Sequence, residues 1–214
     1  MPTVAVVDYG MGNLRSVCKA LERVAPGHRV RLAHNAAELL DADRVVFPGQ
    51  GAMAACMKAL GAGGLQEALL DSAAHKPFLG ICLGLQALYD FSDEDGGVAG
   101  LGLLRGRVPR FAASVGNGGV RLKVPHMGWN QVRQSTAHPL WRGIPQDSRF
   151  YFVHSYYAEP DNPEEVCGVT EYGISFTSAA GRENLFAVQF HPEKSQLAGL
   201  TLLENFCRWD GTTG

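Results

Sequence analysis

The chain has 214 residues, a formal net charge of −2 at pH 7 and 46% hydrophobic residues. This length fits one large domain whose core needs neither disulfides nor a metal. Charged residues make up 19% and include no block of Lys and Arg, which excludes the usual basic footprint of a nucleic-acid-binding protein.

The expected compartment follows from membrane and cysteine signals. No stretch approaches the roughly 20 apolar residues of a membrane span, and the first ten residues have no basic leader. An odd number of cysteines without paired spacing is typical of a reducing compartment. We therefore expect a soluble, cytoplasmic protein with no membrane or nucleic-acid partner; its cysteines are Cys18, Cys56, Cys82, Cys167 and Cys207.

Apolar runs and helical patterns alternate through the first ninety residues. The run Thr3–Val7 is followed by a glycine turn and a helical pattern, for which Asn13 can serve as the N-cap. The runs Arg44–Phe47 and Pro77–Ile81 also lead into helical stretches, and a helix over Leu65–Ala74 precedes the second. This alternation predicts parallel βαβ units, with strands that are covered on both faces.

The second half is rich in Gly, Pro and β-forming residues and predicts mixed or antiparallel strands. We expect a flexible turn at Gly116–Gly119 but no linker, so that residues 1–214 form a single domain. The expected fold class is α/β, flavodoxin-like, with a largely parallel or mixed central sheet flanked by helices and a strand-rich second half. The expected strands are 150–153, 166–170, 174–177 and 185–190, and the last helix is 197–209.

The segment Gly80-Ile81-Cys82-Leu83-Gly84 places a thiol between two glycines, after a predicted strand and before a helix. The same strand–turn–helix device exposes the serine of G-x-S-x-G hydrolases. Small neighbours allow other backbone to approach, and a helix N-terminus stabilises the reactive thiolate. Taken alone, the segment fits a buried structural cysteine equally well. For the other four cysteines the structural interpretation is favoured.

A base and its orienting group are offered by Phe190-His191-Pro192-Glu193. His191 follows a predicted strand, and Glu193 is close enough in sequence to bind its Nδ1, which would leave Nε2 free to exchange a proton with sulfur. Without the Cys82 turn, a loop with a surface carboxylate would explain the same residues. The two segments together favour a Cys82–His191–Glu193 arrangement.

Acyl-transfer chemistry also needs donors for an oxyanion. The loop Pro48-Gly49-Gln50-Gly51 follows a strand and can turn an N–H inward, so the backbone amides of Gln50 and Leu83 are our candidates. The turn at Gly10-Met11-Gly12 lacks the third glycine of a dinucleotide fingerprint, because Arg15 stands there. We therefore expect no nucleotide cofactor, and no metal, since no Cys/His cluster has ligand spacing.

Several motifs resemble a known family, the triad-type class I glutamine amidotransferases. Within it, the chain is most similar to the glutaminase subunits of imidazole glycerol phosphate synthases, and the match extends from residue 4 to residue 209. The matching segments are Gly80–Gln86 and Gln189–Glu193 for the broader family, and Asp8–Leu14, Pro125–Asn130, Phe150–Tyr156 and His191–Lys194 for the narrower one.

The resemblance implies a role for each matching position. Cys82 would attack the glutamine amide, His191 would carry the proton and Glu193 would orient His191. The substrate would be held by Gly49, Gly51 and Gln86 and by the backbone of His154, Ser155 and Tyr156. The subunit interface would include Asn13, Tyr151 and Lys194. From the residues alone, Lys194 is equally an ordinary solvated lysine and Tyr151 a strand-core aromatic.

The resemblance also implies a partner. Ammonia would pass to a (βα)8 cyclase subunit in a heterodimer, where the ribulosyl substrate PRFAR gives imidazole glycerol phosphate and AICAR in histidine biosynthesis. A (βα)8 domain takes about 250 residues, so it would be a separate chain. We expect low glutaminase activity without this partner. The sequence departs from the family at Gln50, where a small aliphatic residue is common, and at Leu85, where Met is common; residues 113–119 receive no function.

Two other interpretations stay open. The chain could be the glutaminase subunit of another synthase, serving anthranilate, aminodeoxychorismate or pyridoxal phosphate synthesis, but the segment His126–Asn130 disfavours it. It could also be a regulatory subunit that keeps the fold without catalysis, because the presence of triad residues does not prove their geometry.

Overall fold

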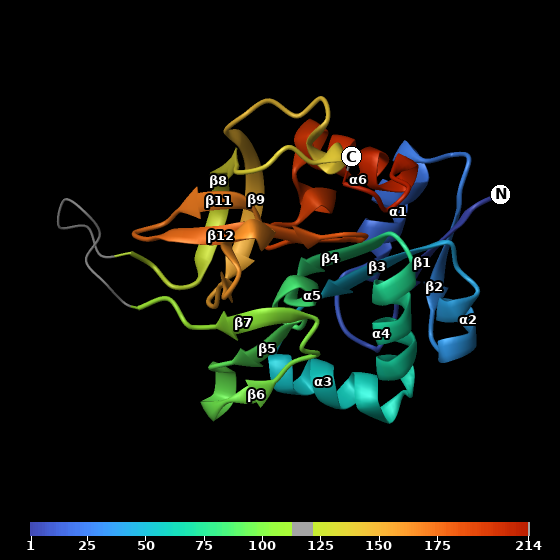
Figure 1. The fold of residues 1–214 in the computed structure, drawn as a ribbon, viewed down its shortest axis with the longest axis horizontal. Helices are drawn as coiled ribbons and strands as arrows, with labels where there is room; N and C mark the ends of the chain where they lie inside the picture. Colours follow the sequence, from blue (N-terminus) through green and yellow to red (C-terminus); the bar gives the residue numbers. More distant parts are fainter. Residues whose placement is uncertain (113–121, 214) are drawn as a thin grey trace.

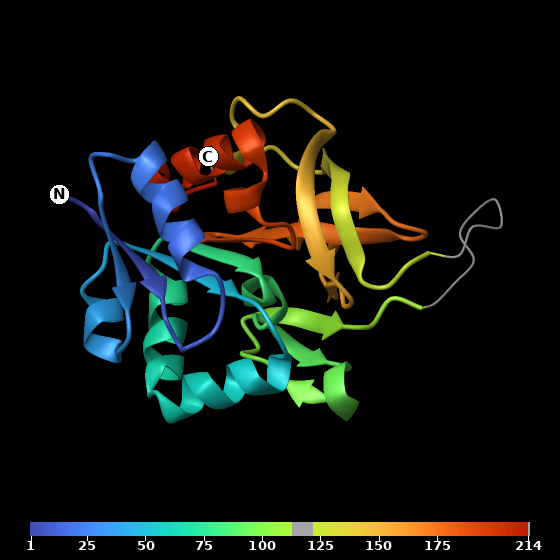
Figure 2. The same ribbon diagram turned by 180° about the vertical axis from the view of Figure 1, so that it is seen from behind.

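The structure is a computed structural model that describes residues 1–112 and 122–213. The turn expected at Gly116–Gly119 lies outside the described residues, as does the whole of the variable stretch 113–119. Within the described part, the chain forms a large sheet, a small second sheet and helices on both faces of the large one (Figures 1 and 2).

The large sheet has the strand order β2-β1-β3-β4-β13-β12-β11-β8-β9. Strands β2 to β13 of this order run parallel, in the 2-1-3-4-5 arrangement of flavodoxin-like folds, and the remaining pairs are antiparallel. The predicted α/β class, with parallel strands in the first half and mixed or antiparallel strands in the second, is therefore confirmed. The strands are β1 (Thr3–Val7), β2 (Arg29–Ala33), β3 (Arg44–Gly49), β4 (Phe78–Cys82), β8 (His126–Gln134), β9 (Ser148–His154), β11 (Val166–Glu171), β12 (Ser175–Arg182) and β13 (Leu185–Val188).

The small sheet lies beneath the carboxyl end of the parallel strands and has the order β10-β7-β5-β6 (Figure 1). Two of its strands contain only two residues, too few to show an alternation that could be recognised in the sequence. All four strands of this sheet are short. They are β5 (Tyr89–Ser92), β6 (Val98–Ala99), β7 (Leu104–Val108) and β10 (Glu159–Pro160).

Helices cover both faces of the parallel strands, as Figures 1 and 2 show. Alternate residues of β1 explain this: Val4 and Val6 join the core beneath α1 and α6, whereas Ala5 and Val7 join the core beneath α3 and α4. Because it is buried on both faces, the strand is apolar from Val4 to Val7. The helices are α1 (Leu14–Val24), α2 (Ala36–Leu40), α3 (Met53–Ala62), α4 (Leu65–His75), α5 (Leu83–Gln86) and α6 (Gln196–Arg208), with short 3-10 turns η1 (Glu94–Gly96), η2 (Pro139–Trp141), η3 (Pro163–Glu165) and η4 (Pro192–Lys194).

Three local expectations need correction. Asn13 occupies the N-cap position of α1, but its side chain makes no capping hydrogen bond, because its φ of −89° and ψ of 63° are not those of an ordinary cap. The strand expected over 185–190 ends at Val188, since the chain turns before Gln189. The helix after Cys82 has only four residues, so it supplies little macrodipole to a thiolate.

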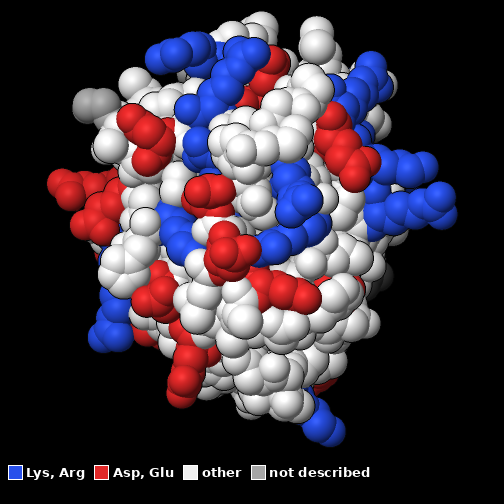
Figure 3. Space-filling model, turned by 90° about the vertical axis from the view of Figure 1, so that its right-hand side faces the viewer, with Lys and Arg blue, Asp and Glu red and all other residues white. Residues whose placement is uncertain are grey.

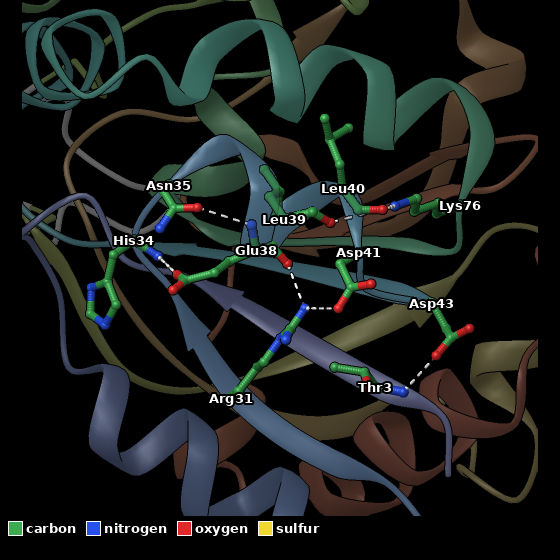
Figure 4. A network of polar contacts seen from close by, with 10 residues as sticks. All are labelled: Thr3, Arg31, His34, Asn35, Glu38, Leu39, Leu40, Asp41, Asp43 and Lys76. Carbon is green, nitrogen blue, oxygen red and sulfur yellow. Dashed lines mark hydrogen bonds and ion pairs between the residues drawn. The ribbon is translucent and has the colours of Figure 1, made fainter.

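The edge formed by β2 and α2 carries a polar network on its surface (Figure 4). Arg31 Nη2 donates to the Glu38 carbonyl at 2.8 Å and to the Asp41 carboxylate at 3.0 Å. Asn35 Oδ1 caps α2 by accepting from Glu38 N at 3.0 Å, and Glu38 Oε2 accepts from His34 N at 2.7 Å. These contacts hold the short helix α2 against the edge strand β2. The arginines of β2 interrupt the apolar pattern by which a strand is recognised in the sequence.

The surface around this edge mixes both signs of charge. Figure 3 shows acidic and basic side chains interspersed over the side of the molecule that lies to the right in Figure 1. Among the described residues, no helix is long and apolar enough to cross a membrane.

Candidate active site

Cys82 is the last residue of β4 and stands directly before α5, with a φ of 56° and a ψ of −108°. This conformation costs a residue with a Cβ about 1–3 kcal/mol and is characteristic of functional turns. The parallel register sets Gly49 of β3 beside Cys82. The sharp turn predicted from the two glycines is therefore present, next to the loop that follows β3.

The glycines around the turn allow backbones to approach closely. A Cβ on Gly84 would stand 1.9 Å from the Phe47 carbonyl oxygen, and a Cβ on Gly80 would stand 2.9 Å from Ala187 Cβ. A Cβ on Gly49 would stand 2.4 Å from Tyr9 Oη. The turn is thus packed against both neighbouring strands, which fixes the direction of the Cys82 side chain.

His191 and Glu193 form a buried pair beside Cys82. His191 Nδ1 lies 3.0 Å from Glu193 Oε1, and the two side chains are 3% and 1% exposed. His191 Nε2 has no hydrogen-bond partner among the described residues. Burial lowers the pKa of His191, but the charge and proximity of Cys82, together with the Glu193 hydrogen bond and charge, outweigh it and raise the pKa to about 10. The imidazole is therefore held in its protonated form when Cys82 is a thiolate.

Ser195 ties this pair to the strand β9. Its hydroxyl donates to the His191 carbonyl at 2.6 Å and accepts from Tyr151 N at 3.0 Å. In return His191 N donates to the Tyr151 carbonyl at 2.9 Å. Both backbone polar groups of Tyr151 are thus bound to the segment that carries His191.

Two buried glutamines continue the site on the other side of Cys82. Gln86 Nε2 donates to the Tyr156 carbonyl and to Gln189 Oε1, both at 3.0 Å. Gln189 Nε2 in turn points at Cys82 Sγ, 3.7 Å away. We did not single out Gln189 from the sequence; the available signal was an amide side chain at the end of an apolar run, directly before His191.

A cavity of about 510 Å³ opens beside Cys82. Glu94 lines it too and was missed, because η1, to which it belongs, gives no sequence signal; its Oε2 accepts from Met53 N at 2.7 Å. Asn13, Gly49 and Glu193 line a small adjoining cavity that shares Gln50 and His191 with the large one. The other predicted site residues all line the large cavity: Gln50, Gly51, Cys82, Leu83, Gln86, Tyr151, His154, Ser155, Tyr156, His191 and Lys194.

The other four cysteines, for which the sequence favours a structural interpretation, lie away from this cavity. Cys18, Cys56 and Cys207 belong to α1, α3 and α6, and burial raises the pKa of each thiol to about 11. Burial also raises the pKa of Cys167 in β11. Thiols with raised pKa values are poor nucleophiles. Cys82 is the candidate because its side chain lies at the cavity beside the His191–Glu193 pair.

The chain is similar to known proteins over nearly its whole length. The family model described as glutamine amidotransferase class-I matches residues 5–209. The chain belongs to the class-I glutamine amidotransferases. Curated relatives in this family include imidazole glycerol phosphate synthase subunit HisH of Nitrosospira multiformis, which is 59% identical over 98% of this chain and 99% of the relative. HisH of Nitrosococcus oceani is 56% identical over the full length of both chains.

Several solved structures share the fold of this amidotransferase. A structure of PurLQS from Thermotoga maritima has a TM-score of 0.71 at 17% identity, covering 97% of this chain and 98% of the other. A glutamine amidotransferase from the same organism has a TM-score of 0.62 at 16% identity, covering 97% of this chain and 96% of the other. At such identities the similarity concerns architecture alone.

We predict that Gly84→Ala destabilises this amidotransferase by about 2 kcal/mol or more, because the new methyl would overlap the Phe47 carbonyl. The free energy of unfolding in denaturant measures the effect. Gly27→Ala is the matched control, since a Cβ there meets nothing within 4 Å and should change stability by less than about 0.5 kcal/mol. Equal stabilities of the two variants would contradict the close packing described for the turn.

We also predict that stability falls in mild acid. Burial lowers the pKa of His126 and His138 to about 4 and that of His154 to about 3. Between these values and the ordinary 6.5, the unfolded chain binds more protons, so the unfolding free energy decreases as the pH falls below 6.5. Each histidine contributes a slope of up to about 1.4 kcal/mol per pH unit.

Denaturant unfolding between pH 7 and pH 4.5 measures this slope. His138→Asn should reduce the slope of unfolding free energy against pH by the contribution of one histidine. Asn retains a side-chain acceptor that can cap η2 as His138 does. An unchanged slope in this variant would contradict the assignment.

Proposed function

We propose that this chain is the glutaminase subunit of an imidazole glycerol phosphate synthase, and that residues 1–214 form one class I amidotransferase domain. One observation carries the proposal: full-length similarity to HisH subunits coincides with a strained Cys82 that faces a buried His191–Glu193 pair in a substrate-sized cavity. The continuous sheet supports a single domain, because β13 of the second half pairs with β4 of the first.

In the proposed reaction, Cys82 Sγ attacks the side-chain amide carbon of glutamine and forms a tetrahedral oxyanion. The backbone amides of Gln50 and Leu83 stabilise this oxyanion. As the C–N bond breaks, protonated His191 gives its Nε2 proton to the leaving ammonia, and a glutamyl thioester remains on Cys82. Neutral His191 then removes a proton from water, which attacks the thioester and releases glutamate and the Cys82 thiolate.

Glu193 keeps Nδ1 of His191 protonated and oriented, so that Nε2 faces the sulfur throughout. Glutamine is held by Gly49, Gly51 and Gln86 and by the backbone of His154, Ser155 and Tyr156. We add Glu94 to this group, because its carboxylate lines the cavity and has the charge that pairs with the substrate's α-ammonium group. No cofactor takes part in these steps.

The partner is a (βα)8 cyclase subunit that uses the ammonia to make imidazole glycerol phosphate and AICAR from PRFAR. We propose Asn13, Tyr151 and Lys194 as contacts with it. Asn13 is exposed, and Lys194 Nζ lies 5.9 Å from the centre of the Tyr151 ring. Trp129 is 40% exposed, and its ring centre lies 6.1 Å from that of Tyr151. It extends this surface with an aromatic side chain, a residue type that is enriched at protein interfaces.

The backbone bonds between Tyr151 and His191 offer a route by which docking acts on catalysis. The five cysteines are all free, which supports a cytoplasmic location in a reducing environment.

The proposal predicts that glutamate and ammonia are released from glutamine at a high rate only when PRFAR and the cyclase subunit are both present. Both products are measured for the chain alone and for the complex. Cys82→Ala should lower the rate of the complex by at least about 10³-fold, because no nucleophile remains. Cys18→Ala, at a half-buried thiol in α1, is the control and should keep wild-type activity.

Activity in the Cys82→Ala complex would refute the mechanism. If glutaminase activity were the same with and without this partner, Cys82 would remain the nucleophile, but the chain would belong to another synthase.

The role of Glu94 predicts that Glu94→Gln raises KM for glutamine by roughly 10- to 100-fold with little change in kcat, since a charge-assisted bond to the ammonium is lost in the ground and transition states alike. Steady-state glutaminase kinetics of the complex measure both constants. Asp95→Asn, at the exposed neighbouring carboxylate, is the matched control. An unchanged KM in Glu94→Gln would place the α-ammonium elsewhere.

A further inference from the structure

Two buried histidines face each other across the β8–β9 pair, next to the large cavity. His126 is the first residue of β8 and His154 the last of β9, and they are direct partners in the register. They are 3% and 6% exposed, and His126 Nδ1 lies 2.9 Å from His154 Nε2. The mechanism above uses the backbone of His154 but neither imidazole.

Both rings are surrounded by aromatic side chains. The His126 ring is stacked between Phe152 and Tyr172, with centroid distances of 4.8 and 4.0 Å. Phe111 and Phe176 pack against both imidazoles. The titratable groups that face the pair are Tyr172, next to His126, and His191, whose positive charge disfavours a charged His154. The two imidazoles are therefore neutral at neutral pH, and each has one N–H donor and one acceptor.

The outer end of the pair fixes the direction of its hydrogen bonds. Asn130 Nδ2 donates to the Glu171 carbonyl at 2.9 Å, and Asn130 Oδ1 accepts from Gln131 N at 2.8 Å. The amide orientation is thus determined, and the second Nδ2 proton points at His126 Nε2, 3.3 Å away. His126 Nε2 must accept this proton, so His126 carries its own proton on Nδ1 and donates to His154.

The inner end of the pair requires the same direction. His154 Nδ1 lies 2.7 Å from the Tyr156 carbonyl, which can only accept. His154 therefore carries its proton on Nδ1, and its Nε2 is the acceptor that His126 needs. The contacts at the two ends of this series of hydrogen bonds therefore require the same direction of donation, from Asn130 to His126, from His126 to His154 and from His154 to the Tyr156 oxygen.

The Tyr156 carbonyl is also where this chain of bonds meets the glutaminase site. It accepts a second bond from Gln86 Nε2, whose other proton goes to Gln189, and Gln189 points at Cys82 Sγ. The position of one carbonyl thus governs the orientation of two buried amides beside the nucleophile. A carbonyl held by two donors is restrained in both position and direction.

We propose that the side chains of Asn130, His126 and His154 form a one-directional hydrogen-bond relay that positions the Tyr156 carbonyl, and through it Gln86, for binding glutamine. The inference rests on the proposed glutaminase function and deepens it. The three side chains are positioning groups, because they act through Tyr156 and not on the reacting atoms. The relay begins at Asn130 on β8, whose exposed Met127 and Trp129 project from the opposite face of the strand, and it ends at the substrate cavity.

The tautomers test the relay without any assay of activity. Nitrogen NMR of the full chain labelled with ¹⁵N-histidine distinguishes the two ring nitrogens of each residue. We expect both His126 and His154 to carry the proton on Nδ1 and to remain neutral from pH 8.5 down to pH 6. An Nε2–H tautomer at either residue, or protonation of either ring in this range, would overturn the proposal.

Asn130→Asp tests the function of the relay, because it replaces the donor to His126 with a carboxylate that only accepts. At pH 8.5, neutral His126 must then place its proton on Nε2, and the bond to His154 loses its donor. We expect KM for glutamine to rise at least about tenfold with kcat changed less than about threefold, tenfold being about 1.4 kcal/mol of binding. At pH 6, the carboxylate favours a doubly protonated His126, which donates to His154 again and brings KM back toward the wild-type value.

The matched control is Asn162→Asp, which makes the same change at an exposed cap where the side-chain oxygen already accepts from Glu164 N. All kinetics are measured on the complex with the cyclase subunit, and thermal unfolding checks that each variant is folded. A KM of Asn130→Asp equal to that of Asn162→Asp at pH 8.5, or raised equally at both pH values, would overturn the relay. Absence of glutaminase activity in the wild-type complex would instead overturn the proposed function, and if Asn130→Asp does not fold, the NMR result decides.

Discussion

The parallel pairing of β4 with β3 on one side and β13 on the other is the constraint on which the site depends. It brings the carboxyl ends of three strands to one edge of the sheet, and these ends lead to Gln50, Cys82 and His191. The packing is close enough that Gly84, next to the turn, must lack a side chain, because a Cβ there would overlap the Phe47 carbonyl. A strained cysteine conformation persists there because strands on both sides hold it, a rigid setting that a short helix could not supply alone.

The buried histidines show how differently one residue type behaves in this fold. His191 has a carboxylate and a thiol as neighbours, and its pKa is raised, whereas His126 and His154 have aromatic rings and each other, and their pKa values are lowered. The charged histidine suits proton transfer to a leaving amine. The neutral pair suits the transmission of orientation, because each ring has one donor and one acceptor. All three histidines are buried, so the difference in their pKa values comes from their neighbouring groups.

Much of this arrangement could be predicted from the sequence, and the exceptions have physical reasons. The strand–turn–helix around Cys82 and the parallel first half follow from local patterns of apolar residues and glycines. The edge strand β2 escaped notice because its alternate residues include Arg29 and Arg31. Gln189 and Glu94 escaped because their roles depend on residues about a hundred and about forty positions away, which sequence spacing does not reveal. The bond from His191 to Glu193, in contrast, spans two residues and was visible as spacing.

The place of β13 in the sheet bears on how the protein is made. This strand is the last to emerge during synthesis, yet it lies in the middle of the sheet, between β4 and β12. Until residues 185–188 leave the ribosome, β4 and β12 each present an open edge, which is a hazard for mispairing with other chains. Before β13 arrives, the Cys82 turn lacks its supporting strand on one side, and the imidazole that follows β13 is also missing. The insertion of one central strand therefore both seals the sheet and brings the thiol and the imidazole of the candidate site together.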